Sequence, residues 1–313
     1  MIIGFHSNQL SVRGTEVALF DYANYNESLL QNTSYIFYPR QADTSSLDKF
    51  KKRFGERVLS YGSMRELEQA CCAKKVDAMY WIKSGTRDGK LISGVKNLVH
   101  AVFNTKQPHG EVYAYVSEWL AKENNMDYVP HIVTLPQTSR DLREVLGIPK
   151  DALVIGRHGG AETFDIEYVK RVTRDIAQTD NNIFFLFLNT NKFAPDSEHG
   201  GKIIHLDSSA DIEYKAAFIN TCDVMLHARG AGESFGLSVC EFLHQDKPVI
   251  TNLHCRDRHH INLLGDHGFY YRDESELRSI ILSFKKTDFK YSDLVKQFSP
   301  ATVMDRFYDV FIR

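Results

Sequence analysis

The sequence predicts an α/β protein built from two doubly wound domains, each with a parallel sheet and helices on both faces. A chain of 313 residues is longer than one ordinary core and suits two domains of about 150 residues each. Short apolar runs alternate with amphipathic stretches along the chain, which indicates strand–helix–strand units with parallel pairing. A segment with two prolines, 129–137, interrupts this alternation and indicates an extended linker.

The first domain is expected to span 1–147. Its expected strands are the short apolar runs 2–6, 35–38, 58–61, 78–82, 98–103 and 112–116. Amphipathic patterns at 15–30 and 63–75 predict helices between them. At 138–151, Ser139 precedes a helical pattern and Gly147 follows it, which predicts a capped helix at the end of this domain.

The second domain is expected to span 148–298. Its expected strands are 153–156, 183–188, 203–206, 224–227 and 248–251, and its expected helices are 163–179, 209–221 and 235–245. Apolar residues at helical spacing in 299–313 predict a last helix, which is either packed or a free amphipathic tail. In doubly wound sheets, ligands bind at the carboxyl ends of the strands, so two such domains facing each other would form a cleft.

The composition excludes several classes of protein. A hydrophobic content of 43% with 25% charged residues is globular, neither disordered nor fibrous. The net charge of -2 and a pI near 6.7 argue against nucleic acid as the main partner. The densest apolar run, 183–188, is strand-sized and too short to cross a membrane. Because the first residues lack a basic region and the five cysteines form no disulfide framework, we expect a cytoplasmic protein.

The stretch GESFGLSVCEFLHQDKPVI, residues 232–250, carries two glutamates, Glu233 and Glu241, around the predicted start of a helix. The glycines before it let the backbone approach a ligand, and the first helical amides form an anion site suited to phosphate. A carboxylate on each side of such a site could accept hydrogen bonds from a sugar and from a ribose diol. The alternative is that Glu241 is an exposed helix residue and Glu233 a loop charge.

This stretch resembles the E-x7-E region of retaining GT-B glycosyltransferases, most closely family 4. The resemblance implies the GT-B fold, in which two Rossmann-like domains face across a cleft and the last helix packs back onto the first domain. It implies that Glu233 approaches the donor sugar as a catalytic residue and that Glu241 binds the ribose. The residues whose amides would bind sugar and phosphate are Ser234, Phe235, Gly236 and Leu237.

In VIGRHGGAETF, residues 154–164, a strand runs into a glycine pair, and this segment resembles the family's phosphate-binding strand end. In the family a G-R pair is followed by a lysine, and Arg157 fits the arginine that binds the diphosphate. The lysine is missing, because Thr163 stands near its place, and His158, Gly159 and Gly160 would compensate through backbone contacts. A structural turn with a surface arginine is the alternative.

The first domain carries the remaining candidates. Gly14 and Thr15, in the loop after the first strand, resemble the family's first glycine loop, whose amides touch the donor phosphates. A plain turn is the alternative. Family members often place a histidine of the first domain beside the anomeric carbon. The resemblance therefore implies this catalytic role for His100, within a strand, or for His109, in the exposed loop after it.

The resemblance therefore implies transfer of a hexose from a GDP- or UDP-linked sugar to a glycan or other hydroxyl acceptor, with retention. No D-x-D triplet for a metal-bound diphosphate occurs, so we expect no metal and no further cofactor. A nucleotide-sugar 2-epimerase and a non-catalytic nucleotide-sugar-binding protein are the alternatives. The basic run 49–54 leaves open peripheral contact with a membrane surface.

Overall fold

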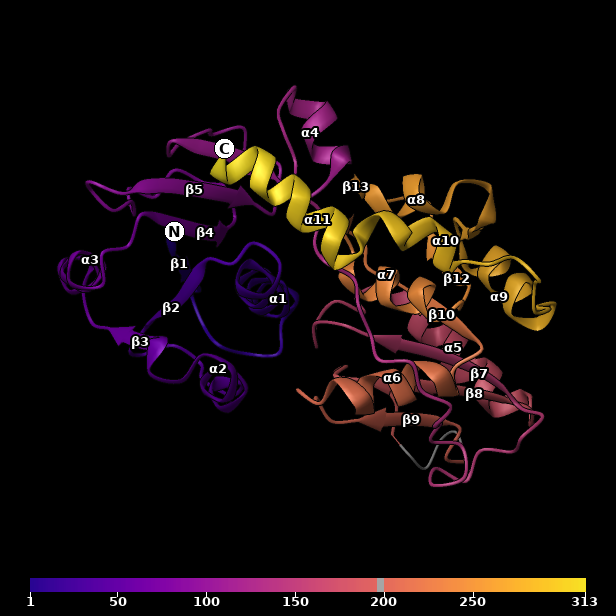
Figure 1. Cartoon of the computed structure of the whole chain (residues 1–313). Helices are drawn as coiled ribbons and strands as arrows, with labels where there is room; N and C mark the ends of the chain where they lie inside the picture. Colours follow the sequence, from indigo (N-terminus) through magenta and orange to yellow (C-terminus); the bar gives the residue numbers. More distant parts are fainter. Residues whose placement is uncertain (196–199) are drawn as a thin grey trace. The chain divides into compact units, whose positions relative to one another are not determined.

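The computed structural model describes residues 1–195 and 200–313 and consists of two compact units (Figure 1). Unit 1 comprises Met1–Ile132 together with Gln297–Arg313, and unit 2 comprises Val133–Lys296. Each unit holds one six-stranded sheet in which every neighbouring pair of strands is parallel. The predicted α/β class with parallel sheets is therefore confirmed.

The sheet of unit 1 has the order β3-β2-β1-β4-β5-β6. Its strands are β1 (Ile2–His6), β2 (Thr33–Pro39), β3 (Val58–Tyr61), β4 (Ala78–Lys83), β5 (Lys96–Ala101) and β6 (Val112–Tyr115). Every residue of β4 is buried, as expected for a central strand covered on both faces, and this explains its unbroken apolar run. The strand order reverses direction between β1 and β4, so the carboxyl ends of these two strands form the switch point of unit 1.

The helices of unit 1 differ in how they begin, and only some have a serine at the N-cap. They are α1 (Gly14–Ser28), α2 (Leu47–Phe54), η1 (Gly55–Arg57), α3 (Met64–Ala73), α4 (Glu118–Asn124), α11 (Pro300–Phe307) and η5 (Tyr308–Ile312). The Ser63 hydroxyl accepts the Glu66 amide at 3.2 Å and so starts α3. In the basic run 49–54, Phe50 and Phe54 are buried in α2, and Arg53 is 2.8 Å from Glu27.

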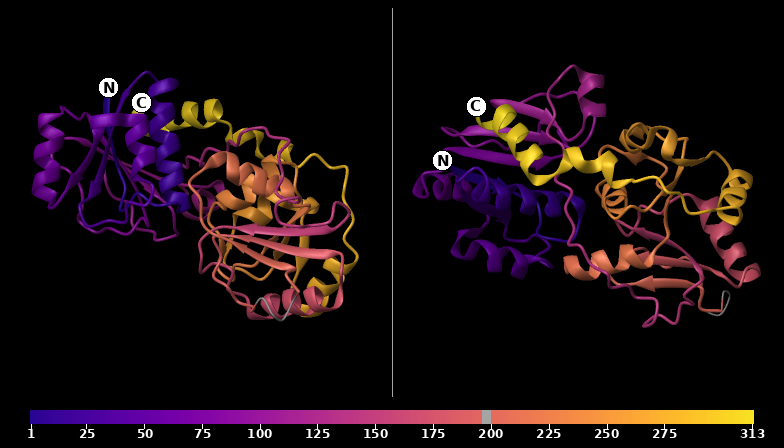
Figure 2. Two further views of the ribbon diagram at one scale, coloured as in Figure 1. Left: turned by 90° about the horizontal axis from the view of Figure 1, so that it is seen from below. Right: turned by 45° about the vertical axis from the view of Figure 1, so that its right-hand side comes forward.

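The C-terminal segment packs within unit 1 (Figure 2), where the yellow C-terminus lies against the indigo and purple N-terminal part of the chain in both views. Phe307 is fully buried, with its ring centroid 5.5 Å from those of Tyr22 and Tyr80. Lys96 on β5 donates from Nζ to the Phe311 carbonyl at 3.0 Å. The last helix thus adds an aromatic layer to the core of this unit.

The sheet of unit 2 has the order β14-β12-β10-β7-β8-β9, the same doubly wound order as in unit 1. Its strands are β7 (Leu153–His158), β8 (Ile183–Leu188), β9 (Ile203–Leu206), β10 (Val224–His227), β12 (Val249–Asn252) and β14 (Phe269–Tyr271). The helices of this unit are α5 (Glu167–Thr179), α6 (Ile212–Thr221), α7 (Leu237–His244), α8 (His259–Leu264), η3 (Gly265–His267), α9 (Glu274–Leu282) and α10 (Ser292–Val295). A separate parallel pair joins β11 (Gly232–Glu233) to β13 (Asp257–Arg258), and η4 (Lys296–Phe298) leads the chain back to unit 1.

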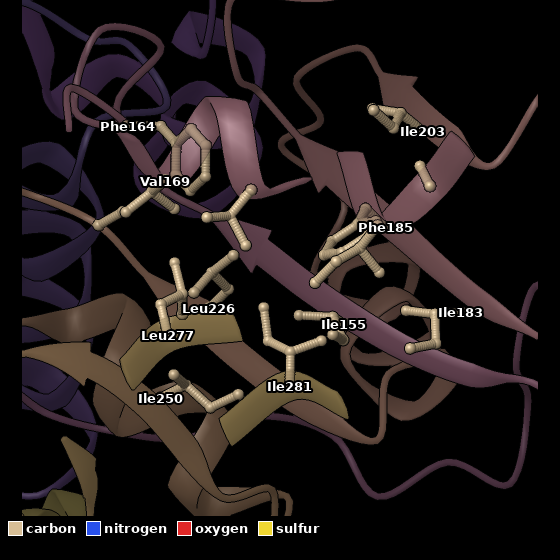
Figure 3. Packing of buried hydrophobic residues seen from close by; sticks show 14 of the residues in the cluster. Ile155, Phe164, Val169, Ile183, Phe185, Ile203, Leu226, Ile250, Leu277 and Ile281 are labelled. Carbon is tan, nitrogen blue, oxygen red and sulfur yellow. The ribbon is translucent and has the colours of Figure 1, made fainter. Parts of the chain in front are cut away.

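The core on one face of this sheet is shown in Figure 3. Ile155, Leu226 and Ile250 come from neighbouring central strands, and at most 1% of the surface of each residue is exposed. Leu277 and Ile281, both on α9, pack into the same cluster. This core supports β7 and β10, whose carboxyl ends carry the candidate site.

The segment 138–151 differs from its prediction. It forms turns instead of a capped helix, because the Leu142 amide donates to the Thr221 hydroxyl at 2.8 Å and Arg143 binds Asp223 at 2.8 Å. These contacts join the segment to unit 2. Unit 2 therefore begins at Val133, whereas the sequence analysis placed the domain boundary near residue 147. Strand β14 and the short pair β11–β13 were not predicted.

Candidate functional site

The candidate site lies in unit 2, at the switch point between β7 and β10 (Figure 1). Val224 and Met225 of β10 pair with Ile155 and Gly156 of β7, so the two strands end side by side. Arg157 and His158 close β7, and His227 closes β10. Ligands of doubly wound sheets bind at this edge, where the two chain directions diverge.

The loop from β10 to α7 takes a path that two glycines permit. Gly232 has φ +74, and a Cβ at this position would lie 2.1 Å from the Asp257 carbonyl oxygen. Gly236 has φ +84 and is the N-cap of α7, which places the first helical amides at Leu237 and the residues after it. Those amides have no acceptor within the helix, so they present positive charge to the loop.

Glu233 lies on β11, directly before this helix start. Its Oε1 accepts from His227 Nε2 at 3.1 Å, and its Oε2 accepts from Arg229 Nη1 at 2.9 Å. Burial alone would raise the pKa of the carboxyl, but His227 and Arg229 outweigh it and lower the pKa below its ordinary value. Glu233 is therefore held ionised with only 14% of its side chain exposed.

A chain of hydrogen bonds orients His227 behind Glu233. Because a carboxylate only accepts, His227 Nε2 donates to Glu233, and its Nδ1 forms a hydrogen bond with the Thr251 hydroxyl at 2.8 Å. His260 Nε2 forms a second hydrogen bond with Thr251 Oγ1 at 3.2 Å. Burial lowers the pKa of His260 far below its ordinary value, so this end of the chain is neutral.

Glu241 lies on the buried side of α7 and is 4% exposed. Lys215 of α6 donates to Oε1, and His158 Nε2 lies 3.0 Å from Oε2. Burial would raise the pKa of this carboxyl, but Lys215 and then His158 lower it to about 2. Glu241 is a buried, paired anion, which does not fit the alternative of an exposed helix residue.

The side chain of Arg157 is buried within unit 2, and the residue is 4% exposed. Its guanidinium donates to the Gly160 carbonyl at 2.8 Å, to the Thr163 hydroxyl at 2.6 Å and to the Thr190 hydroxyl. Burial lowers its pKa to about 10, and the charge of Glu233 acts in the opposite direction. A diphosphate would have to exchange some of these bonds, so the predicted contact of Arg157 with phosphate remains a prediction.

The other predicted residues of unit 2 frame the same edge. Gly159 accepts from Asn189 Nδ2 at 2.8 Å, which ties the glycine pair to the loop after β8. Phe235 is 2% exposed and stacks on His259 at 5.2 Å, while Ser234 and Leu237 are half-buried. Unit 2 thus brings together the predicted residues Arg157, His158, Gly159, Gly160, Ser234, Phe235, Gly236, Leu237 and the two glutamates.

The predicted residues of unit 1 are not gathered at one point. Gly14 and Thr15 begin α1, where Thr15 and Ser11 donate to the buried Glu16 at 2.9 and 3.2 Å. Burial raises the pKa of Glu16 despite these bonds. A carboxyl of the chain itself is therefore close to the helix start that was expected to meet phosphate.

The two candidate histidines have different surroundings. His100 is fully buried in β5, with Nδ1 2.6 Å from the Tyr80 hydroxyl and Nε2 2.8 Å from the Val129 carbonyl. Burial lowers its pKa to about 3, and both ring nitrogens are occupied, so it is a core residue with no surface for a substrate. His109 is half-buried in the loop before β6, with Nδ1 2.8 Å from the Gln107 carbonyl.

Sequence reasoning missed His227, Arg229, Thr251 and Lys215, which position the two glutamates. For His227 the available signal was its place as the last residue of a predicted strand beside the motif. Lys215 is on a helix distant in sequence, and no spacing indicated it. In residues 1–195 and 200–313 no three His, Cys, Asp or Glu side chains cluster to form a metal site, and no helix of the described chain is long and apolar enough to cross a bilayer.

The sequence matches no protein-family model and no functionally curated protein. Solved structures are similar over nearly the whole chain. A glycosyltransferase from Rickettsia africae matches 99% of this chain and 97% of its own at 15% identity, with a TM-score of 0.72. HepE from Anabaena in complex with UDP-glucose matches 99% and 98% at 15% identity, with a TM-score of 0.75.

A sucrose-phosphate synthase from Thermosynechococcus elongatus gives a TM-score of 0.63 at 10% identity, over 99% of this chain and 95% of that one. These structural neighbours are GT-B glycosyltransferases. With its two parallel six-stranded sheets and their helices, the chain has the GT-B fold, and this prediction is confirmed.

Proposed function

We propose that this chain is a glycosyltransferase that moves a hexose from a UDP- or GDP-linked donor to a hydroxyl of a glycan or another acceptor, with retention and without a metal. The observation that carries the proposal is the pair of ionised carboxylates, Glu233 and Glu241, on either side of the start of α7. Both lie at the carboxyl edge of a doubly wound sheet, in a fold whose solved examples include an enzyme with bound UDP-glucose.

Glu241 is the proposed ribose ligand. Lys215 and His158 each approach a different oxygen of the carboxylate, and each oxygen keeps a second lone pair. A ribose can therefore donate both hydroxyls to a carboxylate that is already ionised and oriented. This arrangement favours a vicinal diol over a deoxy analogue.

The proposed diphosphate site is the start of α7. The amides from Leu237 onward point their positive ends at the loop, and Arg229 adds a partly exposed cation. This positive charge stabilises the nucleoside diphosphate as it leaves, which is the role that a metal has in other transferases.

Glu233 is the proposed partner of the reacting sugar. As the bond between C1 and the diphosphate oxygen breaks, positive charge develops on the ring, and the ionised carboxylate stabilises it. The acceptor oxygen forms the new bond to C1 from the same face, and its proton passes to the leaving diphosphate oxygen. His227 and Arg229 hold the carboxylate in place throughout.

Calorimetric titration with UDP-, GDP- and ADP-sugars tests the donor site, and UDP-glucose comes first because HepE binds it. Glu241→Ala should weaken nucleotide binding about tenfold or more, since hydrogen bonds to a charged acceptor are lost. Glu167→Ala removes an exposed carboxylate from α5 in the same unit and should bind as the wild type. Unchanged affinity in Glu241→Ala removes the ribose role.

Product analysis separates transfer from the alternatives. With an acceptor panel, the enzyme should form a glycoside whose anomeric configuration matches the donor, also in the presence of a chelator. Epimerised donor in the absence of any acceptor contradicts the proposal. Nucleotide binding without turnover of any acceptor contradicts it as well.

A further inference from the structure

A cavity of about 660 Å³ lies within unit 1, on the side of β6, and the donor chemistry does not use it. This volume falls within the range of sites that hold small molecules, about 300–1,000 Å³. The lining residues come from the loop after β4, from the segment before and within β6, and from Met126, two residues after the end of α4.

The walls of the cavity are cross-tied. The Arg87 amide donates to Gln107 Oε1 at 2.9 Å, and its guanidinium donates to the Pro108 carbonyl at 2.6 Å. Gly110 has φ +81, and a Cβ there would lie 2.9 Å from the Asn97 carbonyl oxygen. The two loops that face each other are thus held in one arrangement, so the cavity is part of the fold.

The floor and the rim differ in chemistry. Tyr113 is only 7% exposed, Leu91 and Met126 are half-buried, and together they form an apolar floor with one aromatic ring. Arg87 and Glu111 are exposed on the rim and carry opposite charges. Glu111 accepts the Asn97 amide at 2.6 Å, and no ion pair joins Arg87 to a carboxylate within residues 1–195 and 200–313.

His109 lines the wall of the cavity without presenting a ring nitrogen to it. Because the Gln107 carbonyl only accepts, Nδ1 of His109 carries the ring proton in this 2.8 Å hydrogen bond. Nε2 is then an acceptor, shielded from bulk water and without a hydrogen-bond partner in the described part of the chain. Because water does not reach Nε2, a hydroxyl group in the cavity does not reach it either, and His109 contributes only to the wall.

We propose that this cavity binds a sugar ring, with its apolar face on Tyr113 and its hydroxyls on Glu111 and Arg87. A hydroxyl both donates and accepts, so a neutral polyol satisfies the carboxylate and the guanidinium together. An anion would face Glu111, and a purely apolar ligand would leave both rim charges unused. That the bound sugar belongs to the acceptor rests on the proposed function, whereas the binding itself does not.

Methyl-labelled methionine gives a direct readout, because Met126 lines the cavity and the other five of the six methionines do not. The full chain, without nucleotide, is titrated with the methyl glycosides of glucose, mannose and N-acetylglucosamine, and the Met126 signal is assigned with Met126→Leu. We expect a saturable shift of the Met126 signal in the millimolar range for at least one probe, with the other methionine signals unchanged.

Glu111→Gln and Arg87→Gln should each weaken this binding about fivefold or more, since each removes a charged hydrogen bond. Glu118→Gln and Arg65→Gln change exposed charges of the same unit outside the cavity and should bind as the wild type. A Met126 signal that no probe shifts, or that glycerol shifts equally, overturns the proposal. So does binding of glucuronate alone, or wild-type binding by both cavity variants.

A calorimetric titration with UDP on the same sample distinguishes the two proposals. Nucleotide binding without a sugar-dependent shift of the Met126 signal rejects sugar binding in the cavity and supports the proposed donor site. Sugar binding with no nucleotide binding rejects the donor site and leaves the cavity standing.

Discussion

Lys215 determines whether the carboxylate of Glu241 can stay ionised in a buried position. The pKa of Glu241 is about 2, against an ordinary value of 4.5; burial raises it, and the charge of Lys215 is the largest of the causes that lower it. A group with a depressed folded pKa adds stability above its unfolded pKa, and this stability is lost as the pH falls through the folded pKa. The contribution is therefore complete at neutral pH and disappears between about pH 4.5 and 2.

Lys215→Met should lower the free energy of unfolding by about 3 kcal/mol at pH 7, because it leaves a buried charge with His158 as its one remaining close partner. Urea unfolding from pH 7 to pH 3 measures this. The deficit should shrink in acid, where Glu241 of the variant becomes protonated. A deficit that is constant with pH contradicts the ion-pair explanation.

The double variant Lys215→Met/Glu241→Gln is the control for this prediction. It removes both charges, so most of the lost stability should return. Lys170→Met, which removes the partner of the exposed Glu167, should change the free energy of unfolding by less than about 1 kcal/mol.

The conformation of the loop before α7 requires a residue without a side chain at Gly232. Gly232→Ala should lower the stability of unit 2 by about 1–3 kcal/mol, because φ is +74 and the new Cβ would meet the Asp257 carbonyl at 2.1 Å. Gly14→Ala is a matched control, since nothing lies within 4 Å of its Cβ position at the start of α1. Equal thermal unfolding of the two variants would show that the loop is not constrained.

At the residue level, local sequence predicted the two glutamates but not their partners. The pattern of glycine, glutamate and helix start is contiguous, so its chemistry can be read from residues 232–250. Lys215 and Thr251 reach the site from α6 and β12 through the tertiary fold. Lys215 lies 26 residues before Glu241 and Thr251 lies 24 residues after His227, so no local spacing predicted these two contacts. His100 shows the reverse error, because a strand histidine that forms two buried hydrogen bonds looks the same in sequence as a catalytic one.

Among the elements, the strands were predicted best, because their apolar runs are short and bounded by turns. Several predicted strands have the same bounds in the structure, including β1, β8 and β10. The predicted helix at 138–151 had a good cap pattern, yet the contact of Arg143 with Asp223 holds it in turns. Strand β14 was missed because its three residues are too few to show a period.

The last helix makes a prediction at this scale. Phe307→Ala should lower the stability of unit 1 by about 3–5 kcal/mol, because its ring is fully buried against Phe5, Tyr22 and Tyr80. Hydrogen exchange should show the loss in β1 and β4, while β7 and β10 keep their protection. Tyr308→Ala, at an exposed position of the same segment, should leave both sheets unchanged. Unchanged exchange in β1 and β4 would mean that the segment does not stabilise the sheet.

At the scale of the whole molecule, the two units have the same strand order but different chemistry at their switch points. Unit 2 places Glu233, Arg157 and His158 at this edge, with Glu241 paired to His158. Unit 1 places His6 beside Tyr61, with Lys83 paired to Asp88. Burial lowers the pKa of His6 to about 3, with a further contribution from Lys83, so this edge carries a neutral imidazole. We therefore expect a nucleoside diphosphate to bind mainly to unit 2.

Hydrogen exchange with and without UDP measures this expectation. A ligand that binds only the native state stabilises it by about 2.7 kcal/mol at one hundred times its dissociation constant. We expect the exchange free energies of β7, β10 and α7 to rise by up to this amount, and Glu241→Ala to require a higher UDP concentration for the same rise. Additional protection at Gly14 and Thr15 would support their predicted contact with the phosphates. If UDP slowed hydrogen exchange only in unit 1, the proposed donor site would be contradicted. The start of α7, Glu233 and Glu241 all belong to unit 2.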